Sequence, residues 1–229
     1  INNIQNILTL GLSDDWRFER DFQKYNNKCK VYAYDHTVNN DFWIKRFKKD
    51  IIDFLKLKKL RPTKIVDIFK YLEYKNFFKN NNIHIIKKIV NEIKNNNEIK
   101  FEDTIKKLEN VLLKIDIEGD EYKILDSITK EEGKILCLVI EFHEISKNVS
   151  KIIKFKKKLT SLKLIHIHAN NYAGIDVKGD PNCIELTFIN SEKFHVDEKK
   201  SELNYPINNL DSSNMKRRKD LQLIFENER

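Results

Sequence analysis

The chain contains little glycine: five of its 229 residues, with three prolines and three cysteines. Nucleotide-binding α/β folds use glycine where the backbone turns tightly against a ligand, so each glycine position is informative. Apolar runs stay well short of the ~18 residues that a membrane span needs, and no signal peptide is visible. The sequence therefore predicts no membrane span. Because the chain begins with Ile1 rather than Met, a preceding targeting segment or helix is left open.

The cysteines form an odd set without metal-like spacing. Cys29, Cys137 and Cys183 each occur in an apolar, strand-like context. Such residues are typical of small buried core positions in a reducing compartment. We therefore predict a cytoplasmic protein without disulfides.

Composition indicates one large domain and gives a weak signal about partners. Hydrophobic residues make up 40% of the chain, enough for a sizeable core, and we expect one domain with an insertion. The net charge of +8 would suit an anionic partner. However, Lys, Asn and Ile are abundant throughout, which indicates a coding bias rather than a nucleic-acid groove, so no nucleic-acid partner is predicted.

The stretch 111–125, VLLKIDIEGDEYKIL, is the most informative part of the chain. Its apolar run is typical of a strand buried on both faces of a parallel sheet. Asp116 and Glu118 follow at the carboxyl edge, where open α/β sheets bind ligands. Gly119 permits a turn, and Asp120 and Glu121 suit the first turn of a helix with a core side made by Tyr122, Leu125 and Ile128.

The N-terminal residues predict a βαβ unit. A strand over 4–10 runs into Gly11, and a helix that Asp14 or Asp15 can cap follows, with a buried stripe of Phe18, Phe22 and Tyr25. A second strand over 29–34 ends in Asp35. An acid there hydrogen-bonds ribose hydroxyls in nucleotide-binding folds.

The turn GLSDDW keeps only the first of the three usual glycines. Ser13 and Asp14 occupy the space that a pyrophosphate needs, and Asp14 and Asp15 would repel phosphates. This disfavours an NAD-dependent oxidoreductase. S-adenosylmethionine, which has a ribose and a positive charge but no phosphate, fits better.

Further elements follow from hydrophobic periodicity. We expect a helix over 41–60 that ends before Pro62, and a basic, aromatic segment over 63–82 that is either a second helix of an insertion or part of a substrate wall. A third strand over 83–90, a polar loop and a short helix over 101–108 complete this half. The other half predicts strands at 134–143, 162–171 and 184–189, and a helix at 146–162 that Ser146 can cap.

Four segments together resemble the FkbM-like family of class I S-adenosylmethionine-dependent methyltransferases. They are LGLSDDWRFER, KVYAYDHT, VLLKIDIEGDEYKIL and CLVIEFHEI, and the later HIHANNYAG, IELTFI and YPINNLDSSN look like that family's C-terminal portion. Residues 40–100 match least. The element KIDIEGDE is the most specific motif.

The resemblance implies an α/β fold: a Rossmann-like, doubly wound, seven-stranded sheet, mostly parallel with an antiparallel last strand and helices on both faces. Residues 1–229 would form one methyltransferase domain with a helical aromatic and basic insertion at about 40–82 and a C-terminal extension at about 190–229. The cofactor would cross the first, second and fourth strands. Leu10, Gly11, Ser13 and Asp14 would line its methionine part, and Asp35 would hold the ribose hydroxyls.

Three residues are candidates for catalysis: Asp116, Glu141 and His143. Asp116 can orient the cofactor's amino group, accept a proton or hold a cation. Alternatively, Asp116 and Glu118 only cap the next helix. Glu141 and His143 alternate along one strand, and a histidine at a ligand-binding edge is a candidate base, although a structural histidine is the commoner case. A divalent ion on Asp116, Glu141 and His143 is left open and not predicted.

Residues after the 162–171 strand complete the predicted substrate pocket. We expect His168, Asn170 and Asn171 there together with Glu118, and His166 deeper as a structural residue. His166 and His168 could form a metal pair, but they lack a third placed ligand. The basic run 216–219 is expected to be a solvated loop, with contact to an anionic glycan as the alternative.

We therefore predict a methyltransferase that uses S-adenosylmethionine to methylate a hydroxyl of a sugar or another small acceptor in glycan or secondary-metabolite biosynthesis. In it, Asp116 or His143 would remove the acceptor proton, or help a metal to remove it. The alternative is a non-catalytic Rossmann-like module that keeps the fold, as the glycine-poor turn suggests. The sequence does not define the oligomeric state.

Overall fold

The computed structural model describes residues 1–55, 66–196 and 204–223. Its centre is a seven-stranded sheet. Across the sheet, the strands are β3 (Ile83–Ile85), β2 (Lys30–Tyr34), β1 (Asn6–Leu10), β6 (Val111–Ile115), β7 (Ile135–His143), β9 (Cys183–Asn190) and β8 (Leu162–Ala169).

The last strand of the chain runs against the others. Neighbouring strands from β3 to β7 pair in parallel, whereas β9 pairs antiparallel with both β7 and β8. The chain winds outward from β1 to β3 and then crosses to β6 on the other side of β1. This arrangement confirms the predicted Rossmann-like, doubly wound sheet with an antiparallel last strand.

Helices cover both faces of the sheet because its buried strands carry apolar side chains in both directions. Leu8, Leu113 and Ile140 pack in one cluster with α4 (Phe101–Ile105), α5 (Leu125–Lys130) and α6 (Ile145–Lys158). Ile7 and Leu112 pack in a second cluster with residues near α1 (Arg17–Tyr25), α2 (Asn40–Leu55) and α3 (Val66–Phe77). Both clusters converge on β1 and β6, so the core fixes these two strand ends.

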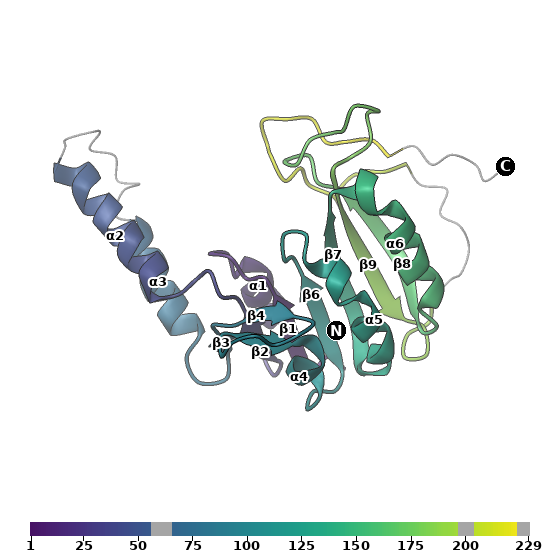
Figure 1. Ribbon diagram of the computed structural model, residues 1–229, viewed down its shortest axis with the longest axis horizontal. Helices are drawn as coiled ribbons and strands as arrows, with labels where there is room; N and C mark the ends of the chain where they lie inside the picture. Colours follow the sequence, from purple (N-terminus) through teal and green to yellow (C-terminus); the bar gives the residue numbers. More distant parts are fainter. Residues whose placement is uncertain (56–65, 197–203, 224–229) are drawn as a thin grey trace.

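Helices α2 and α3 form a pair within the region predicted to be an insertion. Helices α2 and α3 extend away from the sheet at the left of Figure 1. Trp43 is buried between them and contacts Phe47, Tyr71 and Tyr74. Within the segment 63–82, residues 66–77 form the helix α3. Residues 56–65, which include the end of the expected helix over 41–60, lie outside the described residues.

Two predictions about local structure are wrong in part. Of the predicted buried stripe, Phe22 packs against the core, but Tyr25 is 75% exposed and Phe18 is also exposed, while Glu19 is the buried residue of α1. The helix turns its polar Glu19 to the sheet because Thr9 of β1 donates a hydrogen bond to it, at 2.7 Å from Oγ1 to Oε1. The expected strand over 83–90 is split into β3 and β4 (Lys88–Val90), and β4 pairs with β5 (Glu98–Lys100), in the expected polar loop.

The helix expected after Gly119 also begins differently. Residues Glu121–Lys123 form a 3-10 turn, and α5 starts only at Leu125. Glu121 is fully buried instead of facing solvent in a first helical turn. Ser146 lies within α6, which begins at Ile145 without a side-chain cap.

The described helices include none that is long and apolar enough to cross a membrane.

Candidate functional site

The site begins where β1 and β6 diverge, at the point where the chain reverses its direction of winding. Gly11 follows β1 with φ of +81°, and a Cβ there would lie 1.6 Å from the carbonyl oxygen of Asp116. The amide of Asp116 donates to the Leu10 carbonyl at 2.8 Å. Only glycine fits this crossing, which brings the buried Leu10 and the first turn against Asp116.

Asp35 fastens the first turn to the end of β2. Its Oδ2 accepts a hydrogen bond from the Ser13 amide at 2.7 Å, and its Oδ1 accepts two from Thr37, both at 2.6 Å. Burial raises the pKa of Asp35, but the hydrogen bonds from Thr37 and Ser13 outweigh it and lower the pKa overall. The carboxylate is therefore ionised and fixed, and Oδ2 keeps lone-pair capacity for a further donor.

A cavity of about 310 Å³ opens above these strand ends. Its lining includes Gly11, Ser13, Asp35 and Asp116, together with Tyr34 and Ile89. The size lies within the range of small-molecule sites. The predicted cofactor residues Gly11, Ser13, Asp35 and Asp116 thus share one cavity, and it lies at the switch point where open α/β sheets bind ligands.

Asp116 stands between two hollows. It also lines a neighbouring depression with Ser13, Arg17 and Lys114. Its Oδ1 is buried and has no hydrogen-bond partner within the described part of the chain. Burial, and then the nearby Glu141 carboxylate, raise the pKa of Asp116 to about 6. A buried carboxylate oxygen without a hydrogen-bond partner takes up a proton more readily than one that accepts hydrogen bonds.

His143, the last residue of β7, reaches the same place and is surrounded by carboxylates. Its Nε2 lies 3.4 Å from Glu118 Oε2, 3.6 Å from Glu141 Oε1 and 3.9 Å from Asp116 Oδ1. Glu118 is the exposed member. All the predicted catalytic residues therefore lie together.

Glu121 holds His143 from behind. Its Oε1 accepts from the His143 amide at 2.7 Å and lies 3.3 Å from the ring Nδ1, while its Oε2 accepts from the Gly119 amide at 2.8 Å. The hydrogen bond to Glu121 is the largest cause of a rise in the pKa of His143 to about 9, which burial opposes. Glu121 thereby fixes the ring with Nε2 directed at the carboxylates of Glu118, Glu141 and Asp116.

Glu141 joins β7 to the loop after β8. Its Oε1 accepts from Asn170 Nδ2 at 2.9 Å and from the Cys183 thiol at 2.8 Å. Cys183 faces His143 because the two residues are paired across β7 and β9. Burial and the Glu141 carboxylate raise the pKa of the Cys183 thiol. Asn170 is thus beside the predicted catalytic group.

Asp14 has a different set of contacts from the other turn residues. It accepts from Arg46 of α2 and, at 2.7 Å, from Lys70 of α3. Burial raises the pKa of Asp14, and Lys70 and Arg46 more than compensate, so the pKa is lowered. These cations neutralise Asp14, and Arg17 pairs with Asp15. Charge repulsion between this turn and a phosphate is therefore weakened, and the objection to a pyrophosphate rests on the missing glycines.

His168 and Asn171 contact the C-terminal segment. His168 Nδ1 lies 3.3 Å from Glu185 and its Nε2 lies 3.1 Å from Asp220. Asn171 is almost fully buried, with its amide directed at residues 213–219. Both ring nitrogens of His168 are occupied. His166 pairs with Asp211 at 2.7 Å.

Glu121 and Cys183 belong to the site although the sequence does not assign them to it. Acids are usual at a helix start, so nothing in the sequence indicates that Glu121 is buried. Cys183 is predicted only as a core residue. Its position opposite His143 requires the antiparallel register of β7 and β9, which a single sequence does not define.

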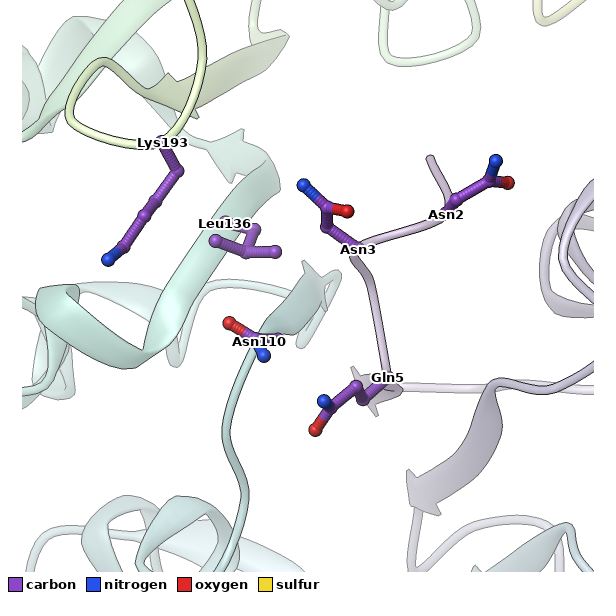
Figure 2. A pocket seen from close by; sticks show the side chains of 6 residues that line it. All are labelled: Asn2, Asn3, Gln5, Asn110, Leu136 and Lys193. Carbon is purple, nitrogen blue, oxygen red and sulfur yellow. The ribbon is translucent and has the colours of Figure 1, made fainter.

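A further hollow lies at the opposite edge of the sheet. It is lined by Asn2, Asn3, Gln5, Asn110, Leu136 and Lys193. Figure 2 shows that these side chains are spread around an open space rather than directed at one point. Its lining includes no carboxylate, imidazole or thiol among the described residues, so the chemistry is concentrated at the carboxyl edge.

Comparisons with known proteins give similarity in overall structure only. No family model matches the chain, and no curated protein matches its sequence. The fibrillarin/Nop5p complex is 13% identical, with 83% of this chain and 74% of that chain covered and a TM-score of 0.47. A putative methyltransferase from Thermoplasma acidophilum is 11% identical, with 82% and 68% covered and a TM-score of 0.39. The plantazolicin methyltransferase BpumL, solved with SAH, is 7% identical, with 81% and 76% covered and a TM-score of 0.41. These weak similarities carry no functional argument, and the FkbM-like family stays a prediction.

Proposed function

We propose that the chain is an S-adenosylmethionine-dependent methyltransferase that methylates a hydroxyl group, with a saccharide as the preferred acceptor. One observation carries the proposal. The cavity of about 310 Å³ at the switch point is lined by a fixed carboxylate, Asp35, and by Asp116, whose buried Oδ1 has no hydrogen-bond partner in the described residues.

The residues present fit the cofactor's chemistry. Asp35 can accept a ribose hydroxyl at Oδ2. Tyr34 and Ile89 supply apolar surface for a base. The carboxylates of Asp116 and Glu118 suit a ligand with a positive charge, since S-adenosylmethionine carries a sulfonium and an ammonium group.

When bound, the cofactor supplies a methyl group on a positively charged sulfur. The chain's own contribution is to align the acceptor and to exclude water. Asp116 is the group we assign to accept the hydroxyl proton, because its buried Oδ1 has no hydrogen-bond partner in the described residues and its side chain lines both hollows. Its pKa of about 6 leaves it largely ionised at neutral pH.

The acceptor side is polar. Glu141, His143 and Asn170 present carboxylate, imidazole and amide groups, and the exposed Glu118 lies next to them. Hydroxyl groups both donate and accept hydrogen bonds, so these groups suit a polyhydroxylated molecule. This supports a sugar as the acceptor. His168 and Asn171 would act through the adjoining loop, since their polar atoms contact the C-terminal segment.

The second candidate function is a non-catalytic module with the same fold. The glycine-poor turn after β1 favours this module. Arg46 and Lys70 neutralise Asp14, so charge repulsion by Asp14 is a weaker argument against a phosphate-containing ligand. An open cavity beside Asp116 supports the enzyme instead, because a module has no need of an unpartnered buried carboxylate there.

Calorimetric titration with S-adenosylhomocysteine tests the proposal. We expect saturable binding at one site per chain, and binding at least tenfold weaker in Asp35→Ala, because the ribose loses a charged hydrogen-bond acceptor. Asp126→Ala is the control, since Asp126 is exposed on α5 and pairs only with Lys158 in the described residues. No binding to the intact chain, or tighter binding of NAD⁺, would contradict the proposal.

A further inference from the structure

The imidazole of His143 is held in one orientation. Glu121 accepts from the amide of His143 and lies 3.3 Å from its Nδ1, and Glu121 is itself fully buried. When the imidazole is neutral, a carboxylate at Nδ1 favours the tautomer with the proton on Nδ1 and the lone pair on Nε2. Metal-binding histidines characteristically have such a carboxylate behind them.

The other ring nitrogen, Nε2, faces three carboxylates. Nε2 is within 4 Å of oxygens from Glu118, Glu141 and Asp116. A lone pair directed at three carboxylates is unfavourable unless a positive charge lies between them. That charge is either a proton on Nε2 or a bound cation.

The position of Cys183 favours a bound metal ion over a proton on Nε2. Its sulfur lies 2.8 Å from Glu141 Oε1, and one ligand atom each from Glu141, His143 and Cys183 lie within 4.8 Å of one another. A buried thiol contributes little to holding a proton on imidazole. A thiolate, an imidazole and a carboxylate together are instead ligands that zinc prefers.

We propose that Glu141, His143 and Cys183 bind a divalent ion of the zinc class, with the fourth position open toward Asp116 and Glu118. Three protein ligands and an open position are typical of catalytic zinc sites. Binding releases the thiol proton of Cys183 and any proton on Nε2 of His143 to solvent. Tetrahedral ligation separates sulfur and oxygen ligands by roughly 3.5 Å, so Glu141 and Cys183 move apart slightly when the ion replaces the thiol proton.

This site extends the proposed function without depending on it. An ion here could bind an acceptor oxygen next to Asp116 and lower the pKa of its hydroxyl. Metal binding is measured without cofactor or acceptor, whereas the methyltransferase proposal is tested by cofactor binding. Failure of one is therefore distinguishable from failure of the other.

Titration with Co²⁺ after treatment with a chelator tests the proposal on the full chain. We expect one Co²⁺ per chain, visible bands of a tetrahedral complex, a near-ultraviolet thiolate-to-cobalt band, and displacement of Co²⁺ by Zn²⁺. The thiolate band should disappear in Cys183→Ser and persist in Cys137→Ser. Cys137 is the matched control because it lies on β7, away from the cluster, and faces the second core.

Two further variants keep the test informative if Cys183→Ser does not fold. His143→Gln should weaken Co²⁺ binding at least tenfold and remove the tetrahedral bands. Glu121→Gln, a positioning variant, should weaken binding by about 10- to 100-fold while the thiolate band remains. Absence of Co²⁺ and Zn²⁺ binding to the wild-type chain, or a thiolate band that survives in Cys183→Ser or is lost in Cys137→Ser, would overturn the proposal.

Discussion

Gly11 is the residue whose identity the site tolerates least. Its φ is +81°, and an added Cβ would lie only 1.6 Å from the Asp116 carbonyl oxygen, which leaves no room for a side chain. We expect Gly11→Ala to lower the free energy of unfolding by about 3 kcal/mol or more, because the strands must separate. Urea denaturation followed by circular dichroism measures this change.

Gly174→Ala is the matched control. Gly174 also has a positive φ, of +73°, but nothing lies within 4 Å of an added Cβ. Gly174→Ala should lower the free energy of unfolding by only about 1 kcal/mol, because it adds backbone strain without a clash. Equal losses for the two variants would show that the close approach to Asp116 is not the cause.

The raised pKa of His168 leads us to predict that the stability of the protein depends on pH. Glu185 and, less strongly, Asp220 raise its pKa to about 9 against burial, from an ordinary value near 6.5. A raised folded-state pKa stabilises the protein fully below about pH 6.5, and this stabilisation is lost as the pH rises through 9. We expect His168→Gln to be less stable than wild type by about 2 kcal/mol at pH 6 and nearly equal above pH 9.5. Thermal melts at both pH values measure the difference, and a gap that stays constant with pH would contradict the ionic role.

For individual residues, the sequence predicts well which side chains lie at the carboxyl ends of the strands. Asp116 and His143 are predicted at the carboxyl edge of a parallel sheet, and β6 and β7 are neighbours, so their side chains meet. Glu121 and Cys183 could not be assigned in this way. Their roles depend on burial and on cross-strand register, which arise only when distant elements pack.

Among the elements, the C-terminal segment is attached to the loop after β8. Figure 1 shows residues 204–223 and the loop 170–182 beside one another, where β8 ends and β9 begins. Asn171 joins them: its amide donates toward the carbonyls of Met215, Arg218 and Lys219, and its Oδ1 accepts from the Met215 amide at 2.8 Å.

Removal of this side chain should release the basic run 216–219. We expect Asn171→Ala to be cut by trypsin there at least tenfold faster than wild type, because the backbone must leave its hydrogen bonds to enter the protease. Mass spectrometry of the fragments locates the cut. Asn6→Ala, which removes an exposed hydrogen bond to Glu109, should leave the rate unchanged. Unchanged cleavage in Asn171→Ala would show that other contacts hold the segment.

Asp14 links the first turn to α2 and α3. We expect Asp14→Asn to increase amide hydrogen exchange in both helices, because it removes the ion pairs with Arg46 and Lys70. These pairs are only partly exposed, so the free energy of unfolding should fall by up to about 1 kcal/mol. Asp21→Asn, which removes exposed pairs with Arg20 and Lys24, is the control and should leave exchange in α2 and α3 unchanged. Exchange that rises equally in both variants would contradict the link.

Elements with continuous apolar runs are predictable, and amphipathic ones less so. The strands β1, β2, β6 and β7 lie where their hydrophobic runs predict. Of the face predicted for α1, Phe22 packs against the core, whereas Phe18 and Tyr25 are exposed. Instead the buried Thr9 of the sheet binds Glu19, an exception that periodicity cannot reveal. The split between β3 and β4 likewise reflects pairing of β4 with β5.

For the whole molecule, the two cores and the switch point account for the position of the site. Clusters on both faces fix the ends of β1 and β6, and the cavity forms where these strands part. The amide-lined hollow at the other edge of the sheet has no comparable chemical groups among its described lining residues. The proposed cofactor site therefore lies at the carboxyl edge.

A crystal structure of the chain soaked with S-adenosylhomocysteine tests this assignment most directly. We predict ligand density in the cavity, with the ribose hydroxyls on Asp35 and the sulfur directed toward Asp116 and His143. Density only in the hollow lined by Asn2 and Asn110, or an empty cavity at saturating ligand, would contradict it.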